Sequence, residues 1–166
     1  MLQVNFTYLD KKELDSWLPK LFDILYDNMS VIAPTGCTYE EDFEEWRSNI
    51  YPAMQKEPRQ IVLMYVDRSL AGYFQYYVNA ATNSLMMEEI QIKKEFQKSG
   101  LFAAFYQWLV KTLPQDILYV EAYANKSNEK SQSILKHLGL AESGENKSGS
   151  CFYFKGSYGA LLKKYC

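Results

Sequence analysis

Two adjacent carboxylates, Glu88 and Glu89, lie within an apolar run that has the residue types of a β-strand. Carboxylates are suited to general acid–base chemistry, because an ionised side chain of this kind can accept a proton from an attacking group. Side chains alternate along a strand, so the two carboxylates point to opposite faces and only one can easily face a substrate. The plainer alternative is an ordinary pair at a strand end with one member in solvent.

A turn with the sequence Gln97-Lys98-Ser99-Gly100 follows, and a strongly apolar, helix-like segment begins at once after it. The opening N–H groups of a helix have no intrahelical partners, and the helix dipole adds a partial positive charge there. A diphosphate satisfies both features. We expect Ser99 to be the N-cap and Gly100 to let a ligand approach the backbone. The alternative is a plain structural turn, since any strand-to-helix connection could use Ser-Gly.

The rest of the sequence predicts the elements that hold these residues. Expected strands are at 3–8, 60–66, 70–78, 84–92, 117–123 and about 150–155. Expected helices follow Asp10 and a capping box at Thr38, and two more cover about 99–113 and about 128–138, the last stopped by Gly139. Pro19 interrupts the first helical pattern, which predicts a kink there or a helix start near Ser16.

This order of elements predicts an α+β (mixed α/β) fold, with helices covering a largely antiparallel central sheet. The three strands between 60 and 92 read as an antiparallel meander. The strand–helix–strand passage from 85 to 123 should be parallel and right-handed, which places the start of its helix at the edge of the sheet. We expect residues 1–166 to form a single domain.

Composition narrows the classes of partner. The net charge is −2 and no basic stripe is present, which argues against nucleic acid. No segment approaches the roughly 18 apolar residues of a membrane span, and no export signal is apparent, so we expect a cytoplasmic protein without a membrane partner. The 3 cysteines are far apart and His137 is the only histidine, so we expect no metal site.

Two segments resemble the signature motifs of the GNAT superfamily of N-acetyltransferases. The stretch from Ile90 to Phe102 resembles the family's cofactor motif, a strand ending in an aliphatic residue and then a loop Gln/Arg-x-x-Gly-x-Gly/Ala that opens a helix. The stretch from Asn128 to Leu140 resembles the second signature, Asn-x-x-Ala-x-x-Leu-Tyr-x-x-x-Gly-Phe. The matching positions there are Asn128, Ser131, Ile134, Gly139 and Leu140. The resemblance implies a GNAT-like fold with a splayed pair of parallel strands and helices on both faces of the sheet.

The resemblance also implies acetyl-CoA as co-substrate and no metal. The pantetheine arm would fill a wedge between the parallel strands, and the pyrophosphate would lie on the amides of the loop. The implied cofactor-binding residues are Ile90, Gln91 and Ile92 on the strand, Gln97, Lys98, Ser99, Gly100, Leu101 and Phe102 in the loop, and Asn128 and Ser131 at the later helix. Lys98 and Phe102 replace glycines that are usual in the family, and Lys98 would add a cation near the phosphates.

Catalysis in the family is usually direct: a neutral amine attacks the thioester carbonyl and a carboxylate accepts the amine's proton. Glu88 stands where several small-amine acetyltransferases of the family carry their proposed base. The resemblance therefore points to Glu88 as the base, with Glu89 as the second candidate. Leu135 takes the place of the tyrosine that often protonates the departing thiolate. Either the thiolate leaves unassisted, which its modest basicity allows, or another group such as Tyr123 or His137 donates the proton, and the sequence does not decide between these alternatives.

Together these motifs predict an N-acetyltransferase that acts on a primary amine of a small molecule. Two alternatives stay open, acetylation of a peptide or protein amine and a non-catalytic GNAT-fold module that binds acyl-CoA. Phe102 and Leu135 are the residues that favour the module. A homodimer is also left open.

Overall fold

The computed structural model describes residues 3–56 and 58–166, which fall into two compact units. Unit 1 is formed by the chain up to Gln75 together with Glu89–Leu101, and unit 2 by Tyr76–Glu88 together with Phe102–Cys166. Each unit is therefore assembled from two separate segments of the chain. The expectation of a single domain over residues 1–166 stays a prediction.

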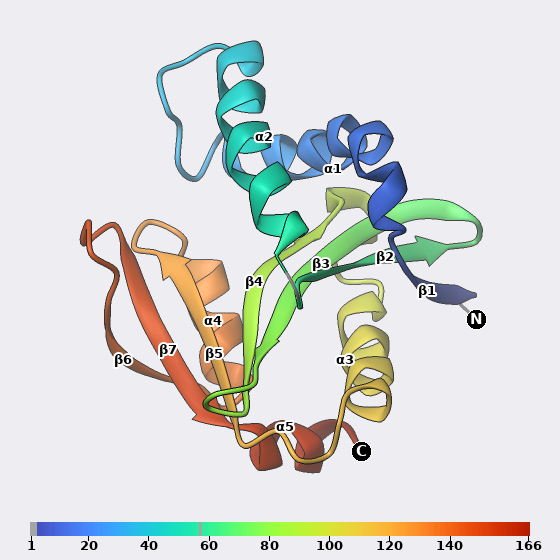
Figure 1. Cartoon of the computed structure of the whole chain (residues 1–166), viewed down its shortest axis with the longest axis vertical. Helices are drawn as coiled ribbons and strands as arrows, with labels where there is room; N and C mark the ends of the chain where they lie inside the picture. Colours follow the sequence, from blue (N-terminus) through green and yellow to red (C-terminus); the bar gives the residue numbers. More distant parts are fainter. Residues whose placement is uncertain (1–2, 57) are drawn as a thin grey trace. The chain divides into compact units, whose positions relative to one another are not determined.

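Figure 1 shows the strands and helices of the described residues. The strands are β1 Val4–Tyr8, β2 Gln60–Val66, β3 Ser69–Asn79, β4 Ser84–Ile92, β5 Tyr119–Asn125, β6 Ala141–Glu145 and β7 Cys151–Ser157. The helices are α1 Leu14–Met29, α2 Tyr39–Gln55, α3 Leu101–Thr112, α4 Glu129–His137 and α5 Tyr158–Tyr165, with short 3₁₀ helices η1 at Lys11–Glu13 and η2 at Lys94–Phe96.

The strands follow the order β1-β2-β3-β4-β5-β7-β6 within the described residues. β1 pairs with β2 in antiparallel fashion, and β7 pairs in the same way with both β5 and β6. β4 and β5 pair in parallel, through Ser84–Met87 and Tyr119–Ala122. The predicted α+β fold, its largely antiparallel sheet and its parallel strand pair are confirmed.

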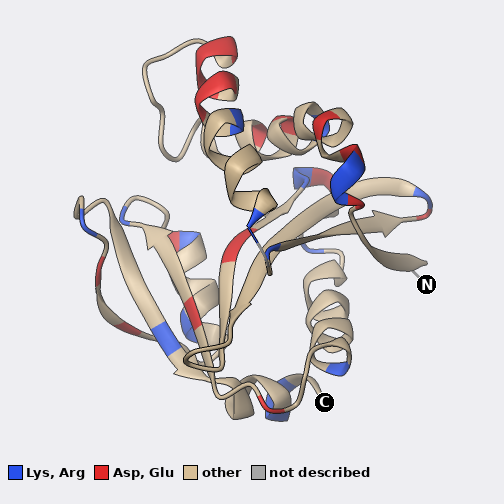
Figure 2. Ribbon diagram, viewed as in Figure 1, with Lys and Arg blue, Asp and Glu red and all other residues tan. Residues whose placement is uncertain are grey.

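The core of unit 1 is formed chiefly by α1, α2, β2 and β3. Apolar residues recur at helical spacing in both helices, so each helix presents one apolar face. The buried cluster consists of Leu9, Leu14, Leu18, Leu21, Ile24, Ile50, Met54, Ile61, Leu63 and Tyr73. The predicted cap of α2 is confirmed, because the Thr38 hydroxyl accepts a hydrogen bond from the N–H of Glu41 at 3.2 Å. Figure 2 shows acidic residues, coloured red, at this end of α2, where their charges complement the helix dipole.

α1 begins at Leu14 rather than near Ser16, and it continues through Pro19 to Met29. A proline inside a helix removes the hydrogen bond to the carbonyl four residues earlier, here that of Asp15. Pro19 and Asp15 are both exposed, so water can reach that carbonyl. Burial of the apolar face on both sides of the proline keeps the helix in one piece.

Unit 2 is built around β5, which has one covered and one open face. Val120, Ala122 and Ala124 are buried, and α4 and α5 pack against this strand. Figure 1 shows α4 behind β5 and β7. The alternate residues Tyr119 and Tyr123 are 42% and 51% exposed, which shows that the other face of β5 is open within this unit.

Two elements of unit 2 were not predicted. β6 and α5 add a strand and a helix to the expected order, and the final strand runs from Cys151 to Ser157 rather than over 150–155. The predicted strand at 117–123 is observed as Tyr119–Asn125. The predicted end of α4 is confirmed, since Gly139 has a φ of +96°, which favours glycine over other residues.

Candidate functional site

β4 carries the two candidate bases, and the division between the units falls between them. Its parallel ladder with β5 joins Ser84–Met87 to Tyr119–Ala122, and Glu88 follows directly. Glu88 is exposed and belongs to unit 2, whereas Glu89 is half-buried and belongs to unit 1. The structure therefore gives the two carboxylates different surroundings.

Glu89 belongs to a hydrogen-bond network in unit 1. The Gln91 amide donates to Glu89, and the Asn28 amide donates to Gln91 Oε1 at 3.0 Å and to the carbonyl of Ile92 at 2.9 Å. Burial and, to a smaller extent, the charge of Glu89 raise the pKa of Tyr73 well above its ordinary value. These contacts tie Glu89 to the interior of unit 1, which favours Glu88 as the carboxylate that meets a substrate.

The loop between β4 and α3 has an unusual backbone conformation. Lys98 and Gly100 both lie in the left-handed region, with φ values of +67° and +87°. The Gln97 amide donates to the carbonyl of Ile92 at 2.9 Å and so closes the loop onto the end of β4. Successive N–H groups in such a turn form a concave surface that binds anions. The loop can therefore accept a phosphate group at the start of α3.

The prediction that Ser99 is the N-cap of α3 is wrong. The helix begins at Leu101, and the left-handed Gly100 separates Ser99 from its first turn. The Ser99 hydroxyl donates a hydrogen bond to the carbonyl of Phe96 instead. Ser99 thus stabilises the turn before the helix, and its hydroxyl is not used as a helix cap.

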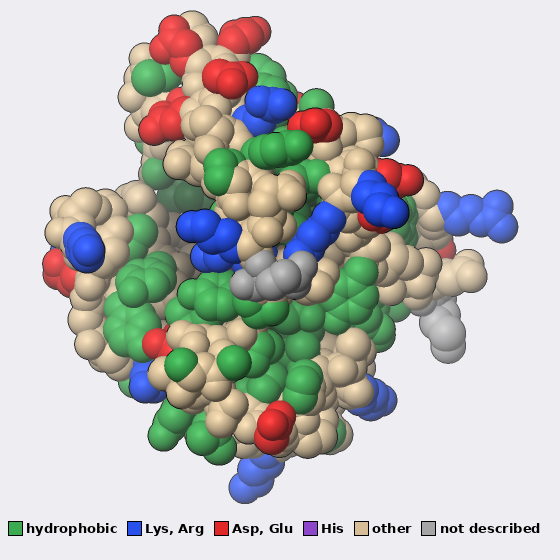
Figure 3. All heavy atoms as spheres, viewed as in Figure 1, with side chains coloured by type: hydrophobic (Ala, Val, Ile, Leu, Met, Phe, Trp, Pro, Cys, Tyr) green, Lys and Arg blue, Asp and Glu red, His purple; other side chains and the backbone are tan. Residues whose placement is uncertain are grey.

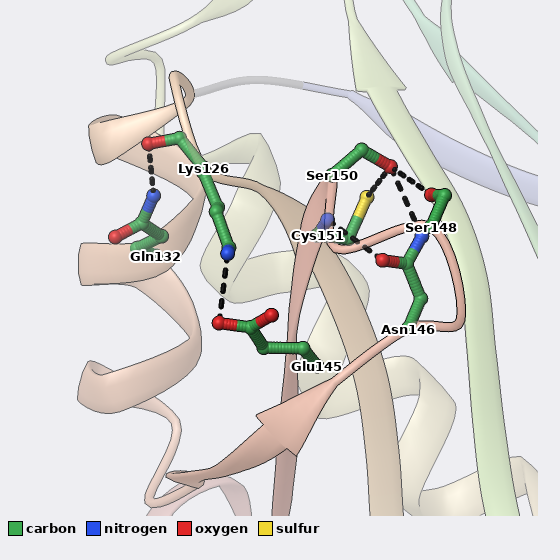
Figure 4. A network of polar contacts seen from close by, with 7 residues as sticks. All are labelled: Lys126, Gln132, Glu145, Asn146, Ser148, Ser150 and Cys151. Carbon is green, nitrogen blue, oxygen red and sulfur yellow. Dashed lines mark hydrogen bonds and ion pairs between the residues drawn. The ribbon is translucent and has the colours of Figure 1, made fainter.

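Asn128 and Ser131 lie together at the start of α4. The Asn128 side-chain oxygen accepts a hydrogen bond from the N–H of Ser131 at 3.0 Å, which makes Asn128 the N-cap of this helix. The preceding loop is also fixed. Gln132 donates at 3.0 Å to the carbonyls of Asn125 and Lys126. Figure 4 shows Lys126 in turn pairing with Glu145 of β6, at 2.7 Å.

Asn128→Ala is expected to lower the free energy of unfolding by about 1 kcal/mol, because the N–H of Ser131 loses its acceptor. Asn128→Ser is the matched control, since a serine hydroxyl can cap the same helix. Urea unfolding of the two variants and the parent without ligand measures the difference. Equal stability of Asn128→Ala and the parent would show that the cap contributes nothing.

The two alternative proton donors lie in different places. His137 is exposed at the end of α4, where its carbonyl accepts a hydrogen bond from Lys164. Because α4 packs on the covered side of β5, His137 belongs to that side, whereas Tyr123 lies on the open face. Leu135 is 7% exposed and contributes to the core. Of the two donors, Tyr123 is the one on the open face of unit 2.

A cavity of about 940 Å³ lies within unit 1. It is lined by Trp17, Lys20, Asp23, Ile24, Tyr26, Asp27, Tyr39, Tyr65, Arg68, Leu70, Lys93, Lys94 and Glu95. The Tyr39 hydroxyl donates to Asp23, and Lys94 lies 4.0 Å from Asp27. Burial and the hydrogen bond to Asp23 raise the pKa of Tyr39 to about 12, so the phenol remains a donor at neutral pH. Both aspartates thus have partners within unit 1.

Two kinds of feature are absent from the described residues. No helix among residues 3–56 and 58–166 is long and apolar enough to cross a membrane. The same residues hold no group of three or more His, Cys, Asp or Glu side chains placed to bind a metal ion.

The sequence matches no protein-family model and no curated protein. Three solved structures resemble the chain closely in fold. An acetyltransferase from Thermus thermophilus matches with a TM-score of 0.72 and 13% identity, over 94% of this chain and 97% of its own. The PaiA N-acetyltransferase from Thermoplasma acidophilum, in complex with coenzyme A, matches with a TM-score of 0.68 and 16% identity, over 94% of this chain and 99% of its own. A mutant of the spermidine N-acetyltransferase SpeG from Vibrio cholerae matches with a TM-score of 0.63 and 13% identity, over 98% of both chains.

The chain has the GNAT fold. Of the two motifs that resembled the family, the first falls on β4, the loop and the start of α3, and the second on α4. Residues Ile90 to Leu101 of the first motif belong to unit 1, and Phe102, Asn128 and Ser131 belong to unit 2. Sequence reasoning did not identify Glu121 and Tyr153 of the open face. The signal available for Glu121 was its place between Tyr119 and Tyr123 in an alternating strand.

Proposed function

We propose that this protein is an acetyl-CoA-dependent N-acetyltransferase whose acceptor is a primary amine of a small molecule. The observation that carries the proposal is the left-handed turn at Lys98 and Gly100, which opens α3 directly after the strand with the two carboxylates. The GNAT fold supports it, because proteins of this fold include an N-acetyltransferase bound to coenzyme A and a spermidine N-acetyltransferase.

The cofactor residues are those of the two motifs. The loop amides from Gln97 to Phe102 would hold the pyrophosphate, and the ammonium of Lys98 would add charge. The backbone of Ile90, Gln91 and Ile92 would face the pantetheine arm, and Asn128 and Ser131 its thioester end. The carbonyl of Ile92 already accepts hydrogen bonds from Asn28 and Gln97, so it is not the backbone group proposed to bind the ligand. Acetyl-CoA supplies the acetyl thioester when bound.

Glu88 performs the proton transfer in the proposed reaction. An amine that arrives as an ammonium ion has no lone pair, so Glu88 takes its proton, directly or through water. Backbone N–H groups of β4 polarise the carbonyl that the amine attacks. The C–N bond forms and the C–S bond breaks. The nitrogen gives its second proton to water, and the thiolate leaves and is protonated in turn. The phenol of Tyr123 lies on the open face of unit 2 and is the proposed proton donor, since Leu135 has no proton to give.

Phe102 is, with Leu135, one of the two residues that favour a non-catalytic module. Its ring lies 4.7 Å from that of Tyr106, one helical turn further along α3. This contact directs the side chain along the helix. We propose that the ring keeps this position when acetyl-CoA binds, so that the loop backbone can contact the pyrophosphate.

Calorimetric titration with acetyl-CoA tests the proposal. We expect saturable binding, followed by release of free thiol when amines are added. Failure to bind at high micromolar acetyl-CoA would overturn the enzyme proposal. Binding without thiol release across a panel of small amines and peptide N-termini would support the module, and release with peptides alone would support a peptide acceptor.

Gly100→Ala is expected to weaken acetyl-CoA binding about tenfold, because the loop holds Gly100 at a φ that alanine adopts only with strain. Gly36→Ala is the matched control. Gly36 also has a positive φ, +79°, and a Cβ at either glycine would meet nothing within 4 Å. Both variants should lose similar stability, and only Gly100→Ala should lose affinity. Equal affinities in calorimetry would remove the cofactor from this loop.

A further inference from the structure

We propose that Glu121 binds a second positive charge of the acceptor, so that the protein selects linear diamines over monoamines. This inference rests on the proposed function and adds a specificity-determining residue to it. The argument uses unit 2 alone, because Glu88, β5 and β7 all belong to it.

Strand register places Glu121 on the same face as Glu88. In the parallel ladder Met86 lies opposite Glu121, so their side chains share one side of the sheet. Glu88 follows Met86 by two residues, and alternation returns it to that side. Burial agrees, because Leu85 and Met87 are buried on the covered side while Glu88 is exposed.

Glu121 has a hydrogen-bond donor but, among the described residues, no ion-pair partner. It is half-buried and accepts a hydrogen bond from the Tyr153 hydroxyl. Lys155 lies directly opposite in the β5–β7 register, yet its ammonium lies over the ring of Tyr119, 4.4 Å from the centroid. In the described part of the chain Glu121 forms no ion pair. A half-buried carboxylate of this kind gains from a cationic ligand, since burial of an uncompensated charge is unfavourable.

Tyrosines surround this carboxylate. The rings of Tyr123 and Tyr153 lie 5.2 Å apart, and Tyr123 is 51% exposed. Burial and the hydrogen bond to Glu121 raise the pKa of Tyr153, so its phenol stays neutral and keeps donating. The faces of such rings attract ammonium groups. Figure 3 shows hydrophobic side chains at the surface over β5 and β7.

The spacing of the two carboxylates sets the length of the acceptor. Neighbouring strands lie about 4.8 Å apart and rise about 3.3 Å per residue, so one strand across and two residues along separates the backbones of Glu88 and Glu121 by roughly 8 Å. The nitrogens of an extended four-methylene diamine are about 6 Å apart, since each of its bonds is about 1.5 Å long. Side-chain torsions can take up that difference. Met86 and Tyr123 lie between the carboxylates and would contact the methylenes.

The kinetic test compares 1,4-diaminobutane with butylamine in the parent and in Glu121→Gln. The parent should favour the diamine, and the ratio of the two kcat/KM values should fall about tenfold in the variant, because one charge-assisted contact is lost. Glutamine keeps an acceptor for Tyr153, so the local structure is retained. Glu142→Gln is the matched control. Glu142 is exposed on β6 and pairs with the buried Phe154, so it does not share the open face with Glu121. An unchanged ratio in Glu121→Gln overturns the proposal.

A binding experiment separates this proposal from the proposed function. Calorimetric titration of 1,4-diaminobutane into each protein, with and without saturating coenzyme A, needs no turnover. Weaker diamine binding by Glu121→Gln than by the parent and by Glu142→Gln supports the role of Glu121, even if no acetyl transfer occurs. Equal binding by the parent and Glu121→Gln, or no binding by the parent, overturns it, even if acetyl-CoA binds and monoamines are acetylated.

Discussion

Glu88→Gln is expected to lower kcat at neutral pH by about 100-fold to 10,000-fold, the usual contribution of a general base. The amide of glutamine has nearly the same shape as the carboxylate but cannot accept the ammonium proton. Glu88 is exposed in unit 2, outside the loop proposed to hold the cofactor, so the dissociation constant of acetyl-CoA should stay within about twofold of the parent. Steady-state thiol release and calorimetry measure the two quantities.

Glu89→Gln is the comparison that decides between the two carboxylates. Glu89 accepts a hydrogen bond from Gln91, and Gln91 accepts one from Asn28. Loss of the Glu89 carboxylate should therefore lower the stability of unit 1 and have a smaller effect on kcat. A fall in kcat confined to Glu89→Gln would transfer the role of base to Glu89. Full activity in both variants would show that neither carboxylate accepts the proton.

Gly72→Ala is expected to lower the free energy of unfolding by about 1–3 kcal/mol, the range found for overpacked interiors. A Cβ at Gly72 would lie 2.4 Å from the carbonyl oxygen of Gln91 and 3.1 Å from the Cα of Ile92. Both are backbone atoms, so β3 or β4 must move. Because Gln91 and Ile92 belong to the proposed cofactor strand, acetyl-CoA binding should weaken as well.

Gly159→Ala is the matched control for that substitution. A Cβ there would approach only the Ser157 hydroxyl, at 3.3 Å, and that side chain can turn away. Gly159 lies in α5, where alanine is favoured over glycine by about 1 kcal/mol. Urea unfolding should therefore show opposite signs for the two variants. Parent-like stability of Gly72→Ala would mean that the strands are not packed as closely as described.

Features with a local cause were predictable from the sequence. Thr38 caps α2 and Gly139 ends α4 as expected, because a cap and a left-handed C-terminal residue are decided within a few positions. The meander was recognisable from β-rich runs separated by turn residues, and the parallel pair from the strand–helix–strand passage between 85 and 123. The continuation of α1 through Pro19 was not predictable in this way, because burial of leucines on both sides of the proline outweighs its tendency to end a helix.

The missed elements depend on partners far along the chain. β6 has the sequence Ala-Glu-Ser-Gly-Glu, all of it exposed, and it is a strand only because β7 pairs with it. α5 is short and contains Gly159, so its sequence carries little helical signal. Ser99 was misassigned because left-handed residues on both sides of it delay the helix, and a non-glycine residue such as Lys98 rarely adopts that conformation.

The sequence predicted which residues belong to the candidate site, but not which side chains those residues contact. The motif residues followed from resemblance. The hydrogen-bond network of Glu89 did not, because it continues through Gln91 to Asn28, and Asn28 and Gln91 are 63 residues apart. The environment of Glu121 likewise depends on the pairing of β5 with β7 and on the contact of Lys155 with Tyr119. Cross-strand neighbours of this kind are set by register, which a single sequence does not specify.

The division of the chain into interleaved segments has a consequence for its synthesis on the ribosome. Residues up to Gln75 complete their unit only when Glu89–Leu101 has emerged, and the intervening Tyr76–Glu88 belongs to the other unit. Ser84–Met87 must then wait for β5, and β5 must wait for β7, before each has a strand partner on both of its edges. A nascent chain stalled between these points exposes unpaired strand edges, which are prone to aggregation. No contiguous fragment of this protein contains one complete unit and leaves out the other.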